Sequence, residues 1–294
     1  MSAPASVLNS PVVGTNLACW CGAAPWLLQF RTPRFGLLRC ASCGGYRIDP
    51  PPLQHESQSE TFYTEYYSSL EVPASGSWFQ KVAVHVPELA GAGKTAADIG
   101  CGDGHLCAEL HGRGWQRVIG IEVSHTRVAR ARRRYPKIEF YDCPLDSTRV
   151  AKRSLDLVVM DSVIEHLLNP VGILREIAGY LKPSGRILLL TPNLESGHFR
   201  FLGRRWTGML APHAHIFLFT RSSIARLLQI SGFQVTHTGS LHAPLYTAGE
   251  WLRRLFSGDV KGAVWRAHQE VGALYGKLIG SGPMLYAVAQ PLAR

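Results

Sequence analysis

The chain has 294 residues, of which 46% are hydrophobic and 18% charged, so it holds enough apolar material for a packed core and is not an intrinsically disordered protein. No stretch reaches the roughly 18 to 20 uninterrupted apolar residues that a membrane-spanning helix needs. Lysine and arginine exceed aspartate and glutamate by 31 to 21, which favours an anionic partner. The excess gathers in four arginines between positions 130 and 134, but no aromatic residues interleave with them, so a nucleic acid partner is disfavoured.

Four of the seven cysteines fall in two tight pairs, Cys19 with Cys21 and Cys40 with Cys43, at a spacing close to that of zinc ribbons. Four thiolates satisfy a tetrahedral zinc ion. The alternatives are four free thiols or two disulfides. No basic, apolar signal peptide opens the chain, so we expect a cytoplasmic protein, where disulfides are disfavoured. Residues 1–50 are therefore expected to form a small zinc-ribbon-like module with a structural zinc ion.

Residues 51–93 are expected to link this module to a larger domain through a partly helical segment that contains Tyr66 and Tyr67. From residue 94 to residue 294, short apolar runs alternate with amphipathic helical stretches. This alternation predicts an α/β domain whose parallel sheet has helices on both faces. The expected strands are 95–99, 118–123, 138–141, 155–160, 186–191, 233–237 and 284–289.

Capping signals place the helices between these strands. Ser124 precedes a helix that Pro136 ends, and Asn169 precedes a helix with proline at its first position. Thr220 precedes a helix that Gly232 ends.

Two regions depart from the alternation. An insertion at about 194–219 is dense in glycine, arginine, histidine and aromatic residues, and such insertions at strand ends often carry substrate residues. Residues 250–280 predict helices with an apolar stripe that includes Trp251, Leu252, Leu255 and Phe256. The stripe fits weak membrane-surface contact or, more commonly, packing in the core or in a homo-oligomer.

A glycine-rich loop follows the first strand of the large domain and opens a helix. Gly100, Gly102 and Gly104 in this loop let a ligand approach the backbone closely, but a GxGxxG dinucleotide fingerprint fails because His105 stands at its third glycine. Glu122 ends the second strand, where a carboxylate can accept both ribose hydroxyls of either S-adenosylmethionine or NAD. The residues alone therefore leave the cofactor open.

Several longer sequence blocks resemble those of a known protein family. AADIGCGDGHL, VIGIEVS and SLDLVVMDSVIEHLLNPVGILREIAGYLKPSGRILLLTPN resemble class I S-adenosylmethionine-dependent methyltransferases. Glu165 with His166, and residues 182–185, are similar to the "EH" and "LKPGG" blocks of that family. The resemblance implies a Rossmann-like seven-stranded methyltransferase sheet over residues 94–294 and S-adenosylmethionine as the methyl donor.

The N-terminal part resembles a narrower subset of that family that carries a zinc ribbon. RCASCGGYRIDPPP followed by YTEYY is similar to this subset, as are Trp206 and the block PHAHIFLFT, with His215, Phe219 and Thr220. Its members include methyltransferases that act on sugars, glycans and small metabolites. The resemblance thus implies a small-molecule, sugar or glycan acceptor. An RNA methyltransferase, or a non-catalytic binding protein on the same fold, is the alternative.

The resemblance also implies roles for individual residues. The residues that it implies for cofactor binding are Asp98, Gly100, Gly102, Gly104, Glu122, Asp142 and Asp161. Within this set Glu122 would hold the ribose and Asp142 would face the adenine. Asp161 would lie beside the methyl group, where it would contact either the cofactor or the substrate. His215 is the leading general base because the insertion that carries it should cover the acceptor. Its rivals are His166, His198 and His213. Tyr66, Tyr67 and Trp206 would line the substrate or pack the small module on the large domain.

Overall fold

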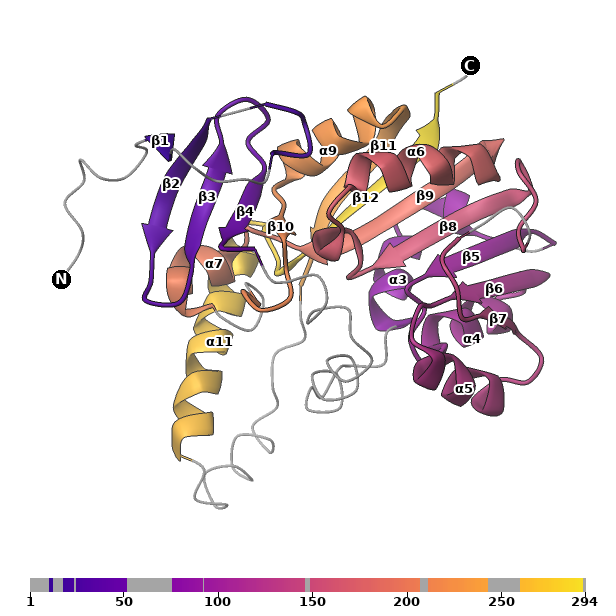
Figure 1. Cartoon of the computed structure of the whole chain (residues 1–294). Helices are drawn as coiled ribbons and strands as arrows, with labels where there is room; N and C mark the ends of the chain where they lie inside the picture. Colours follow the sequence, from indigo (N-terminus) through magenta and orange to yellow (C-terminus); the bar gives the residue numbers. More distant parts are fainter. Residues whose placement is uncertain are drawn as a thin grey trace.

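A computed structural model describes residues 11–12, 18–23, 25–51, 76–91, 93–145, 149–206, 211–242 and 260–292. Its main element is a seven-stranded sheet with the order β11-β12-β9-β8-β5-β6-β7 (Figure 1). Strands β5 to β9 run parallel, and β12 is antiparallel to both of its neighbours. The strands are β5 (Thr95–Ile99), β6 (Arg117–Ile121), β7 (Glu139–Tyr141), β8 (Leu155–Asp161), β9 (Leu181–Pro192), β11 (Phe233–Leu241) and β12 (Met284–Pro291).

All seven expected strands are present, and the predicted α/β fold class is confirmed. The sheet is mixed and not parallel throughout as expected, because β12 runs antiparallel to β9 and β11. The largest difference is in β9, which begins at Leu181 although the sequence predicts a start at residue 186. Leu181 pairs with Leu155, and the register then shifts before Leu157 pairs with Arg186. The "LKPSG" segment is therefore an irregular start of the strand and not the loop before it.

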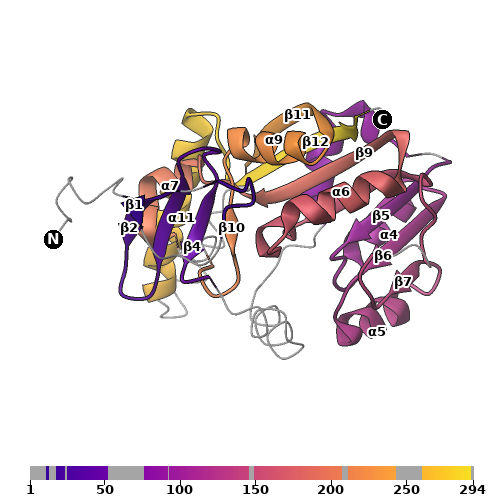
Figure 2. The same cartoon turned by 45° about the horizontal axis from the view of Figure 1, so that its top comes forward.

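Helices cover both faces of the sheet, as Figures 1 and 2 show. One face carries α6 (Pro170–Tyr180) and α9 (Arg221–Ile230), and the other carries α3 (Gly76–Ala83), α4 (His105–Gly112) and α5 (His125–Arg134). Successive strand residues point to opposite faces. In β8, accordingly, Val158 faces the first helix layer and Val159 the second.

The three capping predictions are confirmed. The Ser124 hydroxyl accepts a hydrogen bond from the Arg127 amide at 3.3 Å, and the Asn169 side chain accepts one from the Gly172 amide at 2.9 Å. Thr220 and Ser223 form a reciprocal capping box. Each cap satisfies a backbone N–H that has no partner within its helix and contributes about 1 kcal/mol.

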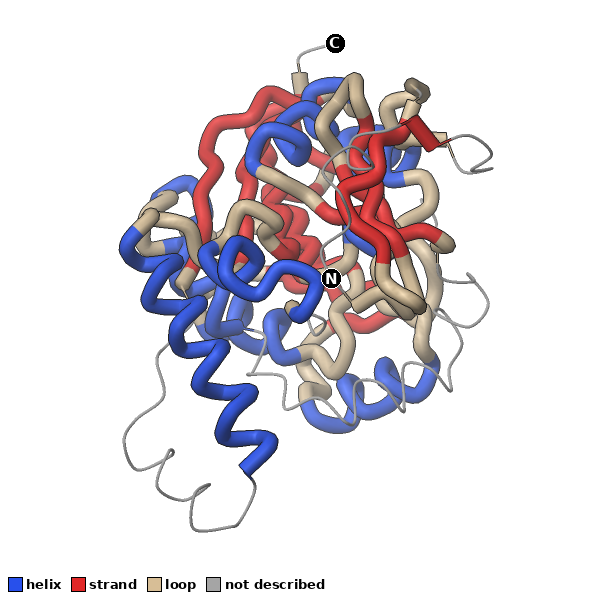
Figure 3. Tube along the Cα trace, turned by 90° about the vertical axis from the view of Figure 1, so that its left-hand side faces the viewer, coloured by secondary structure: helices blue, strands red, loops and turns tan. Residues whose placement is uncertain are grey.

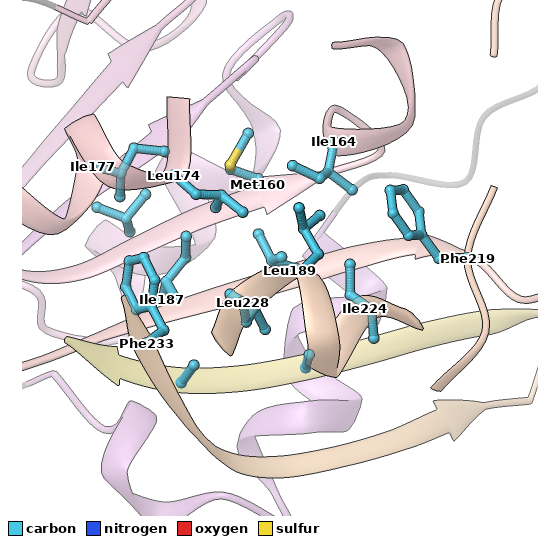
Figure 4. Close-up of a cluster of buried hydrophobic side chains, with 14 of the residues drawn as sticks. Met160, Ile164, Leu174, Ile177, Ile187, Leu189, Phe219, Ile224, Leu228 and Phe233 are labelled. Atoms are coloured by element: carbon cyan, nitrogen blue, oxygen red, sulfur yellow. The ribbon is translucent and has the colours of Figure 1, made fainter. Parts of the chain in front are cut away.

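The hydrophobic core under α6 and α9 extends to two segments that carry candidate site residues. Figure 4 shows Leu174 and Ile177 from α6, and Ile224 and Leu228 from α9, packed on strand residues such as Leu189. Its labelled residues also include Ile164 and Phe219, both fully buried. Core packing therefore fixes the short helix η2 (Ile164–His166) and the end of the insertion.

The N-terminal module forms a second sheet with the order β1-β2-β3-β4-β10. Its strands are β1 (Pro11–Val12), β2 (Trp26–Arg31), β3 (Gly36–Cys40), β4 (Tyr46–Asp49) and β10 (Phe217–Leu218). The last of these comes from the insertion and pairs antiparallel with β4, Phe217 opposite Arg47. A β-bridge between Asn193 and Phe219 ties the same segment to the end of β9. The insertion thus joins the two sheets.

Helix α7 (Gly197–Leu202) and the single turn η3 (Gly203–Arg205) make up much of the insertion. Trp206 follows them and is 2% exposed in a cluster with Leu37, Ile48 and Leu202. It packs the module on the large domain, which is the second of the two roles expected for it. Tyr66 and Tyr67 lie outside the described residues, as does most of 51–75, while the short turn η1 (Pro87–Leu89) follows α3.

The C-terminal helix α11 (Val260–Leu278) lies against α7, and Figure 3 shows it projecting from the body of the molecule. It confirms a helix within 250–280, but Trp251, Leu252, Leu255 and Phe256 lie outside the described residues. Among the helices that the structure describes, none is long and apolar enough to cross a membrane.

Candidate functional site

Acidic residues gather at the carboxyl edge of the main sheet. Asp98 lies near the end of β5, between β8, which ends at Asp161, and β6, which Glu122 follows. Burial raises the pKa of Asp98 to about 8, and the negative charges of Asp161 and Glu122 add to the effect. The three carboxyl groups are therefore within electrostatic reach of one another.

The glycine loop passes over this edge. Gly100, Gly102 and Gly104 have φ values of 74°, 54° and 81°, a region that side-chain-bearing residues rarely adopt. The amides of Gly100 and Cys101 both donate to the Ile121 carbonyl, at 2.7 and 3.1 Å, which folds the loop over the end of β6. Its positive φ values explain why glycine occupies these positions.

Glu122 is 4% exposed and holds this loop. Its Oε2 accepts the Gly102 amide at 3.0 Å, and its Oε1 accepts the amides of Val123 and Ser124 at 2.8 and 3.0 Å. The guanidinium of Arg127 approaches Oε2 to 3.7 Å. Sequence reasoning missed Arg127, because within an arginine-rich helix nothing distinguishes the one side chain that turns toward the loop.

Asp142 lies farther along the same edge, after β7, in a more exposed environment. Its carboxylate contacts His125 Nδ1 at 2.9 Å and Arg132 Nη2 at 3.3 Å. The His125 bond is the main reason why the pKa of Asp142 lies below its usual value.

A second polar centre lies beyond β8, and we call Glu165, His166 and His215 the Glu-His-His centre. The Glu165 Oε2 accepts a hydrogen bond from the Thr191 hydroxyl at 3.0 Å, and its Oε1 lies 3.9 Å from His215 Nε2. The His166 and His215 rings meet edge to face, with centroids 4.8 Å apart. Burial raises the pKa of Glu165 to about 8 and lowers that of His166 to about 4.

Backbone contacts hold the two segments of this centre together. The Ile216 amide donates to the Glu165 carbonyl at 2.9 Å, and His166 Nδ1 lies 3.0 Å from the Ala214 carbonyl. The charge of Asp161 also raises the pKa of Glu165, so the centre is within electrostatic reach of the acidic edge.

Of the four histidines considered as a base, His166 and His215 come together here. His198 instead stacks on Trp206 with a centroid distance of 6.1 Å, and His213 is exposed. Sequence reasoning named Glu165 only as part of a family block. Glu165 joins the Glu-His-His centre through His215, which lies fifty residues later in the sequence. The sequence therefore offered only one indication of its role, which is that it precedes His166.

The four predicted zinc ligands also come together. Cys19 Sγ lies 3.4 Å from Cys43 Sγ, and Cys21 Sγ lies 3.7 Å from Cys40 Sγ, too far for disulfide bonds of about 2.05 Å. Four sulfurs at about 2.3 Å from a tetrahedral zinc ion lie about 3.8 Å apart. The Gly45 amide donates to Cys43 Sγ at 3.3 Å, an orienting contact typical of metal-bound thiolates. The arrangement fits a zinc ion.

The strand order, the glycine loop and the acidic edge define the fold of the class I S-adenosylmethionine-dependent methyltransferases. The profile of a family described as "Methyltransferase domain" matches residues 76–238, more than half of the chain. The chain belongs to this methyltransferase domain family.

Named relatives agree with this placement. A probable S-adenosylmethionine-dependent methyltransferase of Mycolicibacterium smegmatis is 31% identical over 163 residues, which are 55% of this chain and 61% of the relative. A ubiquinone biosynthesis O-methyltransferase of Aeromonas salmonicida is 27% identical over 52% of this chain and 68% of that protein. The chain thus spans only about three-fifths of the first relative's length.

Among solved structures, the chain is similar to the Burkholderia thailandensis 1,6-didemethyltoxoflavin-N1-methyltransferase with bound 1,6-didemethyltoxoflavin and S-adenosylhomocysteine. The TM-score is 0.54 at 15% sequence identity, over 90% of this chain and 99% of that one. At this identity the likeness concerns the fold alone.

Proposed function

We propose that this protein transfers a methyl group from S-adenosylmethionine to a small-molecule, sugar or glycan acceptor. The observation that carries the proposal is the position of the Glu-His-His centre, within electrostatic reach of Asp161 and next to the acidic edge. Methyl transfer is an in-line displacement at the sulfonium carbon, so the protein mainly aligns donor and acceptor and handles the proton of the acceptor.

We assign the donor to the acidic edge. Asp98 and the loop glycines would hold the methionine part and the ribose, Glu122 the ribose hydroxyls, and Asp142 the adenine amino group. Carboxylates suit these tasks because hydroxyl and amino groups donate hydrogen bonds to them. Asp161 would lie beside the methyl group.

His215, with His166 beside it, would handle the acceptor's proton. Its ring is buried between Glu165 and His166, and its segment belongs to the insertion that was expected to cover the acceptor. The name of one relative supports a small molecule, since that protein is a ubiquinone biosynthesis O-methyltransferase.

The contacts of α5 weigh against RNA as the acceptor. Arg127 and Arg130 both approach Asp103, and Arg132 contacts Asp142 and the Phe140 carbonyl. These guanidinium groups already have partners within the chain, so they offer less charge to a phosphate backbone than the sequence indicates.

We also propose that the four cysteines bind a structural zinc ion and that the module positions the acceptor side. Within the zinc-ribbon-like module of residues 1–50, β4 pairs with β10, and the Ile48 amide donates to the Ile216 carbonyl at 3.1 Å, next to His215.

A methyl-transfer assay tests the acceptor class. Zinc-loaded protein and labelled S-adenosylmethionine would be offered phenols, sugar nucleotides, glycans and RNA. We expect turnover with a small hydroxylated acceptor, and a fall in kcat of roughly 10²- to 10⁴-fold in His215→Ala. His213→Ala, a change at an exposed histidine of the same segment, is the control. Turnover with RNA alone, or full activity of His215→Ala, would contradict the assignment.

A further inference from the structure

One buried oxygen of the Glu-His-His centre lacks a partner. Glu165 is 0% exposed, and among the residues that the structure describes its Oε1 has no hydrogen-bond partner. The nearest cationic candidate, His215 Nε2, is 3.9 Å away, beyond hydrogen-bond distance. A buried carboxylate oxygen without a partner is costly, so this position favours a bound cation.

The other atoms of the centre are already oriented in the way that metal ligands usually are. The Thr191 hydroxyl fixes Glu165 through Oε2, which leaves Oε1 to face the histidines. A carbonyl oxygen only accepts hydrogen bonds, so His166 Nδ1 must donate to the Ala214 carbonyl, and the lone pair of this imidazole is then on Nε2. Metal-binding histidines typically donate their second ring N–H to a carbonyl or carboxylate in this manner.

We infer that Glu165, His166 and His215 bind a divalent first-row transition-metal ion. Two imidazoles and one carboxylate suit Zn²⁺, Mn²⁺ or Fe²⁺. Each ligand atom would lie about 2.0 to 2.2 Å from the ion, so two of them can be at most about 4.4 Å apart. The 3.9 Å between Glu165 Oε1 and His215 Nε2 lies within this limit, and all candidate ligand atoms fall within 4.8 Å of one another, so a small rotation of the half-buried His166 completes the site.

Three protein ligands leave coordination positions open, which is typical of catalytic and not of structural metal sites. What the open position does rests on the proposed methyltransferase function. There the ion binds a hydroxyl oxygen of the acceptor and lowers its pKa, and the proton leaves to solvent. That oxygen forms a bond to the methyl carbon while the carbon–sulfur bond breaks, and the electron pair of the broken bond stays on the sulfur of S-adenosylhomocysteine. His215 then acts on the acceptor's proton indirectly, as a ligand that holds the ion, and does not accept the proton itself.

Mn²⁺ separates this site from the cysteine cluster, because it prefers oxygen and nitrogen ligands whereas the four thiolates select zinc. The full chain, loaded with one equivalent of zinc for the cysteine cluster and then freed of excess zinc, would be titrated with Mn²⁺ while the electron paramagnetic resonance signal of free Mn²⁺ is recorded. We expect one Mn²⁺ per chain, with at least tenfold weaker binding in Glu165→Gln and in His215→Ala. His213→Ala should bind Mn²⁺ as the unchanged protein does.

Glu165→Gln keeps the shape of the side chain and an oxygen for Thr191, and S-adenosylhomocysteine binding checks that each variant is folded. Absence of Mn²⁺ binding, or equal binding by Glu165→Gln and His215→Ala, overturns the metal site and leaves the methyltransferase proposal standing. Mn²⁺ binding that depends on both residues supports the site even if no methyl transfer is found, since the readout requires none.

Discussion

Carboxyl groups at one edge of one sheet differ in chemistry because their surroundings differ. Asp98 is buried, so its pKa is raised to about 8, and that of Asp161 is raised to about 6 for the same reason. Asp142 lies in a more exposed place against His125 and Arg132, and its pKa is lowered. At pH 7 without cofactor, Asp98 therefore holds its proton while Asp142 is charged.

This difference predicts a pH dependence of cofactor binding. S-adenosylmethionine carries a cationic sulfonium and an ammonium group, which favour the charged form of Asp98. Binding must then release a proton below pH 8, so affinity should rise by up to about tenfold per pH unit between pH 6 and pH 8. Calorimetry in two buffers of different ionisation enthalpy measures both the affinity and the number of protons released on binding. An affinity independent of pH over this interval would refute the assignment of Asp98.

Asp98→Asn is the matching control. The pKa of Asp98 is higher in the folded than in the unfolded chain, so its stabilising contribution is complete below about pH 4 and is lost as the pH rises through 8. The cofactor-free protein should therefore unfold at a lower temperature as the pH rises from about 4 to about 8. The unfolding temperature of Asp98→Asn should change less over the same interval.

Glu122→Ala tests the ribose contact. Hydrogen bonds to a charged group contribute about 1.5 to 3 kcal/mol, so we expect S-adenosylhomocysteine to bind roughly ten- to hundredfold more weakly. Glu139→Ala is a matched control, since Glu139 lies on the neighbouring β7 and forms an exposed ion pair with Arg117 at 2.8 Å. Equal affinities of the two variants in a calorimetric titration would count against the assigned role of Glu122.

Local sequence predicts residues whose role depends on their own strand or loop. The loop glycines and the acids at the strand ends were placed in this way. Arg127 and Glu165 were not, because what distinguishes them is a partner that only the folded chain brings near: the glycine loop for Arg127 and His215 for Glu165.

At the scale of elements, the same distinction separates the helices from β10. Ser124, Asn169 and Thr220 mark their helix starts because a cap is a contact within one turn. Strand β10 is two residues long and pairs with β4 about 170 positions earlier, so no local sequence pattern predicts it. That pairing couples the cysteine module to the histidine of the proposed acceptor site.

Removal of the proposed zinc ion from the module should therefore affect catalysis more than cofactor binding. Without the ion, β4 and β10 lose their support and His215 loses its position, whereas the glycine loop is held by Glu122 and β6. We expect chelation, or Cys40→Ser, to lower kcat at least tenfold, on the order of the loss from a misplaced catalytic group. The affinity for S-adenosylhomocysteine should change less than threefold, a change of under about 0.7 kcal/mol. Return of activity on adding zinc is the control for chelation, and a parallel loss of affinity and kcat would contradict the coupling.

At the scale of the whole molecule, three parts meet at the proposed site: the carboxyl edge of the main sheet, the insertion, and the sheet that the insertion shares with the cysteine module. The alternation of strands and helices predicts the first part, since each strand and its helix are neighbours in sequence. The meeting of the other two depends on contacts between distant segments, such as the packing of Trp206 on Leu37 and Ile48.

The most direct test of the methyltransferase account is a calorimetric titration of the zinc-loaded protein with S-adenosylhomocysteine, with NAD titrated in parallel. The account predicts one S-adenosylhomocysteine per chain with a micromolar dissociation constant, and no comparable binding of NAD. A protein that unfolds cooperatively, and is therefore well folded, but binds NAD instead or neither ligand would contradict it.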